Sequence, residues 1–385
     1  MYRPLVFLVA FFLYVAGVWA VATTPWTAAT AGTLTTAGGA GAPPGTAATA
    51  QPTATPASTA TPAPSPSGIP SPSGTPAVWT LSTLRNYLVA ETDRTDPHTA
   101  LVDLERITRK DPYVDGFCHP VAHEIGHAAL AKYHGDFAKA VSYRDDVCGS
   151  GYLHGVVEQK LSESPNPASA VTTLCAPRQT ASCIHGIGHG AMFVANLDVT
   201  GAERLCDRFP QTSEVVACSE GVFMQLFEPD ETDPRAMAKL PADKLAADPL
   251  YPCPDQPAVF QSGCYYYAPS YFLQRHDYTA HPEAYVQALA WCLRAPDQGG
   301  RASCTKGAGS RLMKYNIERP VWAAAQCEKA SPGQRYTCMA GMVSYWDVNY
   351  ADDSAGSKLC SQLGGEARSN CRSAAADAGD STSAD

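Results

Sequence analysis

Cysteines recur along this chain at intervals that predict a repeated helical fold. The sequence has 14 cysteines, all between residues 118 and 371. Seven of them open segments in which apolar residues recur every three or four positions, and successive openings are 35, 35, 46, 40, 34 and 33 residues apart. A period near 35 residues with helical patterning is typical of stacked helical hairpins. The openings are Cys148, Cys183, Cys218, Cys264, Cys304, Cys338 and Cys371.

A second cysteine precedes six of these openings by 8 to 12 residues. That separation suits a disulfide that joins the end of one helix to the start of the next across a turn. The pairs are Cys175 with Cys183, Cys206 with Cys218, Cys253 with Cys264, Cys292 with Cys304, Cys327 with Cys338 and Cys360 with Cys371. The even total leaves Cys118 with Cys148, so we predict seven disulfides and an oxidising compartment. The alternative role for a cysteine is metal ligand, and it is strongest for Cys118, which precedes His119.

Most of the openings share a Cys-x-x-Gly signature, as in Cys148 to Gly151 and Cys338 to Gly341. In period and layout the repeat resembles the Sel1 and tetratricopeptide classes of α-solenoid, which implies paired helices and a groove able to hold a protein or peptide. Alternating strand patterns are not evident. We therefore predict an all-α fold of disulfide-stapled helical hairpins. Single helices are expected from Asp136 to Val147, after Pro167 and after Pro320.

The N-terminal part of the chain is expected to lie outside the folded domain. Residues 1–22 carry Arg3 and then an uncharged, mostly apolar run, which is typical of a secretory signal peptide or an N-terminal membrane anchor. Either one places the remainder outside the cytoplasm, secreted or anchored. Residues 23–78 are uncharged and rich in Thr, Pro, Ser and Ala, so they are expected to form a disordered linker.

The helical-repeat domain is expected to span residues 79–375, with a disordered tail at residues 376–385. About 300 residues is ample for a hydrophobic core. The formal net charge of −9 does not support a nucleic-acid partner, and membrane contact is expected only through residues 1–22.

Residues 118–189 hold an unusual set of histidines on three successive candidate helices. Histidine or glutamate recurs there at a spacing of four residues, and side chains four apart share one helix face. The residues are His119, His123, His127, His154, Glu158, His185 and His189. Neutral imidazole is a common ligand for zinc and a good one for copper and iron. The pattern predicts a metal site, with zinc as the expected ion and copper, iron or a two-metal site as alternatives.

These residues have different expected roles. His119 and Glu158 are either ligands or partners that fix the orientation of another imidazole. The remaining histidines are expected to be ordinary hydrogen-bonded residues: His98, His134, His276 and His281. Glycines are frequent on the three helices, at positions such as Gly126, Gly155 and Gly188, although each costs about 1 kcal/mol relative to alanine. We expect them to let the helix backbones approach closely and so bring the histidines within reach of one ion.

The segment from His123 to His127 reads His-Glu-Ile-Gly-His and resembles the HExxH helix of zincin metallopeptidases. The resemblance implies that both histidines bind zinc and that Glu124 acts as general base. The third histidine of the metzincin pattern is absent, because Tyr133 occupies its position. The gluzincin pattern takes a downstream glutamate, a role in which Glu158 could serve.

Two functions follow from these patterns. The first is an extracytoplasmic helical-repeat protein that binds a transition metal for a structural, sensory or metal-handling purpose. The second is a zinc hydrolase or peptidase in which Glu124 activates water. We favour the first, because the candidate ligands outnumber those of one catalytic zinc and no strand edge is evident on which a peptide could lie.

Overall fold

The computed structural model describes residues 78–143, 147–176, 180–229, 240–349 and 356–382. The expected signal or anchor segment lies outside these residues, as does the linker up to residue 77. All regular structure in the described ranges is helical, which confirms the all-α fold. The first three helices are α1 (Leu81–Arg94), α2 (Pro97–Thr108) and α3 (Pro112–Asp115).

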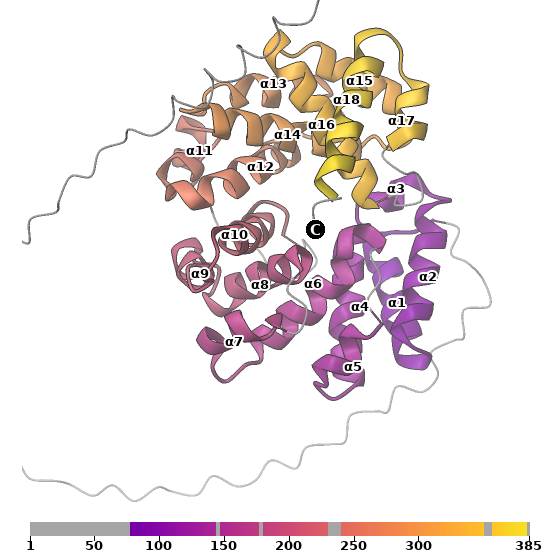
Figure 1. Cartoon of the computed structure of the whole chain (residues 1–385). Helices are drawn as coiled ribbons and strands as arrows, with labels where there is room; N and C mark the ends of the chain where they lie inside the picture. The colour runs from indigo at the N-terminus through magenta and orange to yellow at the C-terminus, as the bar shows by residue number, and fades with distance from the viewer. Residues whose placement is uncertain (1–77, 144–146, 177–179, 230–239, 350–355, 383–385) are drawn as a thin grey trace, which may run out of the picture. The chain divides into compact units, whose positions relative to one another are not determined.

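Long helices alternate with short ones along the rest of the chain (Figure 1). The long helices are α4 (Cys118–Lys132), α6 (Val147–Ser162), α8 (Ala181–Val194), α10 (Thr212–Phe227), α12 (Ala258–Arg275), α14 (Gln298–Lys314), α16 (Pro332–Asn349) and α18 (Gly365–Thr382). The short ones are α5 (Phe137–Val141), α7 (Pro167–Thr173), α9 (Val199–Cys206), α11 (Ala242–Ala247), the 3-10 helix η3 (Cys253–Asp255), α13 (Glu283–Cys292), α15 (Pro320–Glu328) and α17 (Ser357–Gln362).

Each long helix packs against the next long helix, from α4 through to α18. The short helices α5, α7, α9, α13 and α15 each lie against both long helices that flank them in the sequence, which is the arrangement of stacked helical hairpins. The end of the repeat also touches its beginning, because α16 packs on α6 and the Tyr345 hydroxyl donates to Asp115 at 3.3 Å. No helix among the described residues is both long and apolar enough to span a bilayer.

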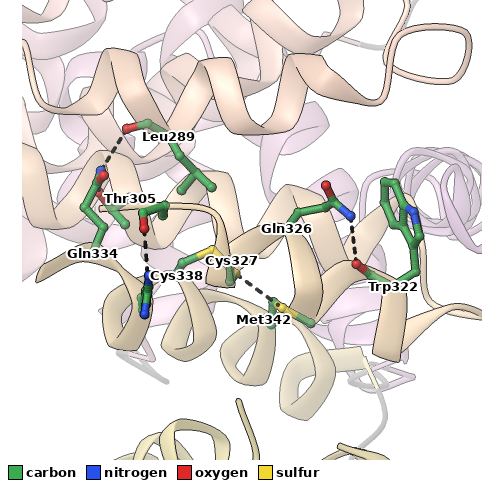
Figure 2. Close-up of a disulfide and its surroundings, with 10 residues drawn as sticks. Leu289, Thr305, Trp322, Gln326, Cys327, Gln334, Cys338 and Met342 are labelled. Carbon is green, nitrogen blue, oxygen red and sulfur yellow. Dashed lines mark hydrogen bonds between the residues drawn. A yellow bond between two sulfur atoms is a disulfide. The ribbon is translucent and has the colours of Figure 1, made fainter. Parts of the chain in front are cut away.

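All seven predicted cysteine pairs are present, with Cα–Cα separations of 5.3 to 5.9 Å. The Cys327–Cys338 pair joins α15 to α16 (Figure 2). Beside it, the Gln334 side chain donates to the Leu289 carbonyl at 2.8 Å and to the Thr305 hydroxyl at 3.0 Å. The disulfide therefore fixes a hairpin that is also tied to the two preceding helices.

The sequence pattern predicts that each repeat cysteine begins its helix, but in five repeats the helix begins earlier. In α10, α12, α14, α16 and α18 the helix begins six residues before the cysteine. The reason is visible in α14, where the Asp297 carboxylate caps the helix by accepting from the Gly300 N–H at 2.8 Å. Asp136 likewise caps α5, but that helix ends at Val141 rather than at Val147. At the C-terminus, α18 continues to Thr382, beyond the residue 376 at which the tail was expected to begin.

The glycines allow the close backbone contact that was expected of them. A Cβ added at Gly126 would stand 2.8 Å from the Val156 amide nitrogen, and one at Gly155 would overlap the His123 carbonyl. The Cys-x-x-Gly signature has the same explanation, because a Cβ at Gly221 or Gly341 would overlap a carbonyl of an adjacent long helix. This contact sets the spacing at which side chains from neighbouring helices meet.

Candidate metal centre

Four of the predicted histidines meet at one point. His119 and His123 lie on α4, His154 on α6 and His189 on α8, and one ring nitrogen from each lies within 4.8 Å of the others. The His119 Nε2 atom is 3.1 Å from His123 Nε2 and 3.4 Å from His154 Nδ1. Ligand atoms placed tetrahedrally around zinc at its usual bond length are about 3.3 Å apart. These two separations fall on either side of that value, and all four ring nitrogens lie within 4.8 Å of one another.

The other ring nitrogen of each histidine is held from outside the cluster. His119 Nδ1 donates to the Cys148 carbonyl at 2.6 Å, and His189 Nδ1 donates to the Gln225 amide oxygen at 2.8 Å. His123 Nδ1 lies 3.1 Å from the Glu158 carboxylate, and His154 Nε2 lies 3.1 Å from the Ser182 hydroxyl.

Outer contacts of this kind are what fix the tautomer and orientation of metal-binding imidazoles. They leave one nitrogen of each ring directed inward: His119 Nε2, His123 Nε2, His154 Nδ1 and His189 Nε2. The His189 Nε2 atom is buried and has no hydrogen-bond partner among the residues that the structure describes. A buried polar atom without a partner is costly, and a metal ion would satisfy it.

Burial favours the neutral form of three of these imidazoles. It lowers the pKa of His119 and of His154 well below the ordinary 6.5, and nearby imidazoles lower both further. For His189 burial is again the main cause, and the pKa falls to about 4. Since only neutral imidazole binds a metal, the low pKa values mean that protons compete weakly for the site at pH 7.

Glu158 links the cluster to His127. One carboxylate oxygen lies 3.1 Å from His123 Nδ1 and the other lies 3.1 Å from His127 Nε2. Burial raises the pKa of Glu158, but His127 and His123 more than offset this and hold the pKa well below its usual range. Glu158 is therefore an ionised outer partner of two imidazoles in this arrangement.

The remaining predicted residues lie beside the four histidines. His127 contacts Glu158, and its Nδ1 atom is 3.8 Å from the Glu124 carboxylate. The His185 ring stacks on His154 with centroids 4.8 Å apart, and its Nε2 atom is buried without a hydrogen-bond partner in the described part of the chain. The zincin resemblance implies a joint role for His123 and His127, whereas the structure places only His123 in the four-imidazole group.

The cluster faces a pocket with a volume of about 940 Å³. His119, His123, His189 and Glu124 line one part of it. Five further lining residues occupy the same place in successive repeats, ten positions after the repeat cysteine: Glu158, Phe193, Glu228, Gln274 and Lys314. One register position of the long helices therefore forms much of the pocket wall.

Sequence reasoning missed Gln225, Ser182 and the pocket residues Glu228 and Lys314. The signal that could have found the last two is the repeat register, because they follow Cys218 and Cys304 by the same ten residues that separate Glu158 from Cys148. Glu228 accepts hydrogen bonds from the Arg311 guanidinium, and from the Lys314 ammonium at 3.1 Å. The pocket thus has an imidazole region and a region of buried charge.

No protein-family model, curated protein or solved structure matches this chain. The likeness to Sel1 and tetratricopeptide repeats therefore rests on period and layout, and the likeness to zincins rests on five residues.

Proposed function

We propose that this protein binds a transition-metal ion, with zinc as the expected metal, through His119, His123, His154 and His189. The observation that carries the proposal is the convergence of four ring nitrogens whose opposite nitrogens are each held by a separate outer partner. Imidazoles that were only core residues would need no common orientation. Here the orientation directs one nitrogen from each ring to the same point.

We propose that the helical domain functions outside the cytoplasm. Seven disulfides are consistent with an oxidising compartment, as is the apolar segment of residues 1–22. We propose that this segment either directs secretion or anchors the chain, and that the helical domain presents its metal on the outer side.

Elemental analysis of the purified protein after dialysis tests the proposal. We expect one equivalent of zinc, and the same measurement distinguishes copper or iron from zinc and one ion from two. His154→Ala and His189→Ala should each lose most of the metal, because each removes an inward nitrogen and opens a cavity beside the others. The matched control is His276→Ala. The His276 ring donates to the Phe272 carbonyl on α12, so its removal should leave the metal content unchanged.

Thermal unfolding adds a second readout. A ligand that binds only the native state stabilises it by mass action, by about 2.7 kcal/mol when its free concentration is 100 times the dissociation constant. Removal of the metal with a chelator should therefore lower the melting temperature of the unmodified protein. The same treatment should hardly change His189→Ala. Protein that retains no transition metal and gains no stability from added zinc, copper or iron would contradict the proposal.

A second candidate function is zinc-dependent hydrolysis, and the pocket is the observation that favours it. A structural ion needs no adjoining pocket, whereas here His123 and Glu124 line a pocket large enough for a substrate. In this alternative the metal would polarise a bound water and Glu124 would take its proton. Glu124→Gln would then keep the metal and lower any hydrolytic turnover by about 100-fold or more. Unchanged turnover in that variant would reject hydrolysis and leave metal binding intact.

A further inference from the structure

A buried group of charges faces the same pocket as the histidines. Glu228, at the end of α10, accepts from the Arg311 guanidinium, from the Ser270 hydroxyl at 2.5 Å and from the Lys314 ammonium at 3.1 Å. The side chains of Arg311, Glu228 and Lys314 are only 4%, 5% and 11% exposed. A charge removed from water to this extent needs a partner of opposite sign.

The group has one more positive charge than negative. Burial raises the pKa of Glu228, but Arg311 and Lys314 lower it to about 2, so that the carboxylate is ionised. One carboxylate thus lies between two cations. Arg311 is well accommodated elsewhere, because its guanidinium lies over the Tyr267 ring at 4.8 Å and donates to the Ser310 hydroxyl at 2.9 Å. Lys314 makes fewer such contacts, with Glu228 as its ion-pair partner and the Tyr315 ring 5.6 Å from its ammonium, so we assign the excess positive charge to Lys314.

Lys314 is also the member of this group that can reach a ligand. It lines the pocket together with Glu228, whereas Arg311 does not. An ammonium group carries three N–H donors, and Glu228 provides an acceptor for one of them. Among the residues that the structure describes, the other donors have no hydrogen-bond acceptor, which leaves them to an anionic group that enters the pocket.

The other carboxylates of the pocket do not meet this need. Glu318 pairs with Arg319 at 3.1 Å, and Asp111 accepts from the Tyr113 amide at the start of α3. Glu158 contacts two imidazoles, and Glu124 lies beside His127. A metal held by the histidines would further offset the negative charge of Glu124 and Glu158, which lie on its side of the pocket.

We propose that the pocket binds a small organic carboxylate whose carboxylate group pairs with Lys314 and whose body extends toward the histidine cluster. The inference rests on the proposed metal site for the far end of the ligand and for the charge that offsets Glu124 and Glu158. The volume of about 940 Å³ is suitable for a small molecule or a short peptide end. Tyr278 and Tyr315 line the pocket with stacked rings 4.2 Å apart, which offers a flat surface to an apolar or aromatic ligand body.

The test compares acids with their uncharged amides on the full-length, zinc-loaded protein by titration calorimetry. One pair of probes is hydrocinnamate and hydrocinnamamide. The other is N-acetyl-trialanine and its C-terminal carboxamide. We expect at least one acid to bind 10-fold or more tightly than its amide. A preference within the first pair identifies a free acid as the ligand class, and a preference within the second identifies a peptide C-terminus.

Lys314→Met decides whether the lysine is responsible. This variant leaves Glu228 and Arg311 as a balanced pair, so it should fold, and its melting temperature and zinc content verify that. The acid should then bind no better than the amide. Lys314→Arg keeps the charge and should retain most of the preference for the acid. Lys329→Met, which removes an exposed lysine outside the pocket lining, should bind like the unmodified protein.

The outcomes separate this inference from the metal proposal. Protein that holds zinc but binds each acid no better than its amide overturns the carboxylate inference alone. A preference for the acid that survives Lys314→Met overturns it as well. Protein that holds no metal contradicts the proposed function, but a preference for the acid that depends on Lys314 would still support the carboxylate site.

Discussion

The first half of the helical array, α4 to α9, and the second half, α10 to α18, are built in the same way but bury different polar groups. In α6 and α8, as in α14 and α16, the long helix carries a disulfide cysteine followed by a glycine that lies against its neighbour. Six positions after that cysteine the first half has His154 and His189, whereas the later repeats have Ser270 and Ser310. The cysteine and glycine that set the helix packing are therefore independent of the buried polar groups, which occupy a few fixed positions in each repeat.

The two halves also differ in how their buried polar groups are satisfied. In the second half Glu228 and Arg311 pair with each other, so these two charges are balanced without an added ion. In the first half burial lowers the pKa of His189 to about 4, and the inward nitrogen of this neutral ring lacks a hydrogen-bond partner among the described residues. The same scaffold therefore holds a balanced ion pair at one place and, at another, a group of imidazoles that still lacks a partner for one nitrogen.

The largest effect is expected from closing the glycine contacts. Gly155→Ala in the first half and Gly341→Ala in the second each place a methyl group against a backbone carbonyl that cannot move aside. We expect each to lower the free energy of unfolding by about 3 kcal/mol, measured in urea with chelator present. Only Gly155→Ala should also reduce zinc binding, because only it separates α4 from α6.

The control for these variants is Gly333→Ala in the first turn of α16, where an added Cβ meets nothing within 4 Å. It should be neutral or slightly stabilising. Equal loss of zinc in Gly155→Ala and Gly341→Ala would show that the two halves do not separate packing from metal binding.

Glu228→Gln should be the next most costly change. It leaves Arg311 and Lys314 without a negative partner, which should lower the free energy of unfolding by about 2 kcal/mol at pH 7 and leave the zinc content unchanged. The pKa of Glu228 is about 2 in the folded protein and close to 4.5 when unfolded. A lowered pKa stabilises above the unfolded value, so the difference between the variant and the unmodified protein should shrink as pH falls from about 4.5 toward 2.

Glu158→Gln should affect the metal more than the fold. An amide is a weaker acceptor for the His123 N–H, and loss of such an outer partner typically lowers metal affinity about 10- to 100-fold. Competition titration with a zinc indicator would measure the change. Glu163→Gln, at the exposed position that follows the end of α6, is the control and should bind zinc normally. An unchanged affinity in Glu158→Gln would remove Glu158 from the account of the centre.

The smallest effect concerns a buried carboxylate that forms no ion pair with any residue in the described part of the chain. Glu203 in α9 is 4% exposed, and burial, with the charges of Asp207 and Asp198, raises its pKa to about 7. A raised carboxylate pKa means that folding favours the protonated form, so stability falls as pH rises from about 4.5 to 7. Glu203→Gln should therefore stabilise the protein by about 1 kcal/mol at pH 8 and much less at pH 5, as measured by urea unfolding.

The sequence was sufficient to predict the helical class and all seven disulfides, because cysteine spacing limits which residues can meet. It also predicted that Gly126 and Gly155 would bring two helices together, and it located the histidines by their helical spacing. The sequence could not show which of these histidines come together in one group. His127 shares a helix face with His123, but how far a ring reaches depends on what the neighbouring helix presents at that level, and there α6 presents Glu158.

The outer partners were beyond sequence reasoning for the same reason. Gln225 meets His189 only because α10 packs on α8, and the Cys148 carbonyl meets His119 across the α4–α6 contact. Non-helical backbone angles at Cys148, Gly149 and Ser150 shape that contact. Such partners follow from tertiary packing, and no local sequence pattern predicts them.

X-ray absorption spectroscopy at the zinc edge tests the central claim most directly, because it counts and identifies the atoms bound to the ion. For the zinc-loaded protein we predict three or four imidazole nitrogens at about 2.0 to 2.1 Å, with at least one lost in His189→Ala. Sulfur ligands, an ion surrounded only by oxygen, or a spectrum unchanged by His189→Ala would contradict the four-histidine centre.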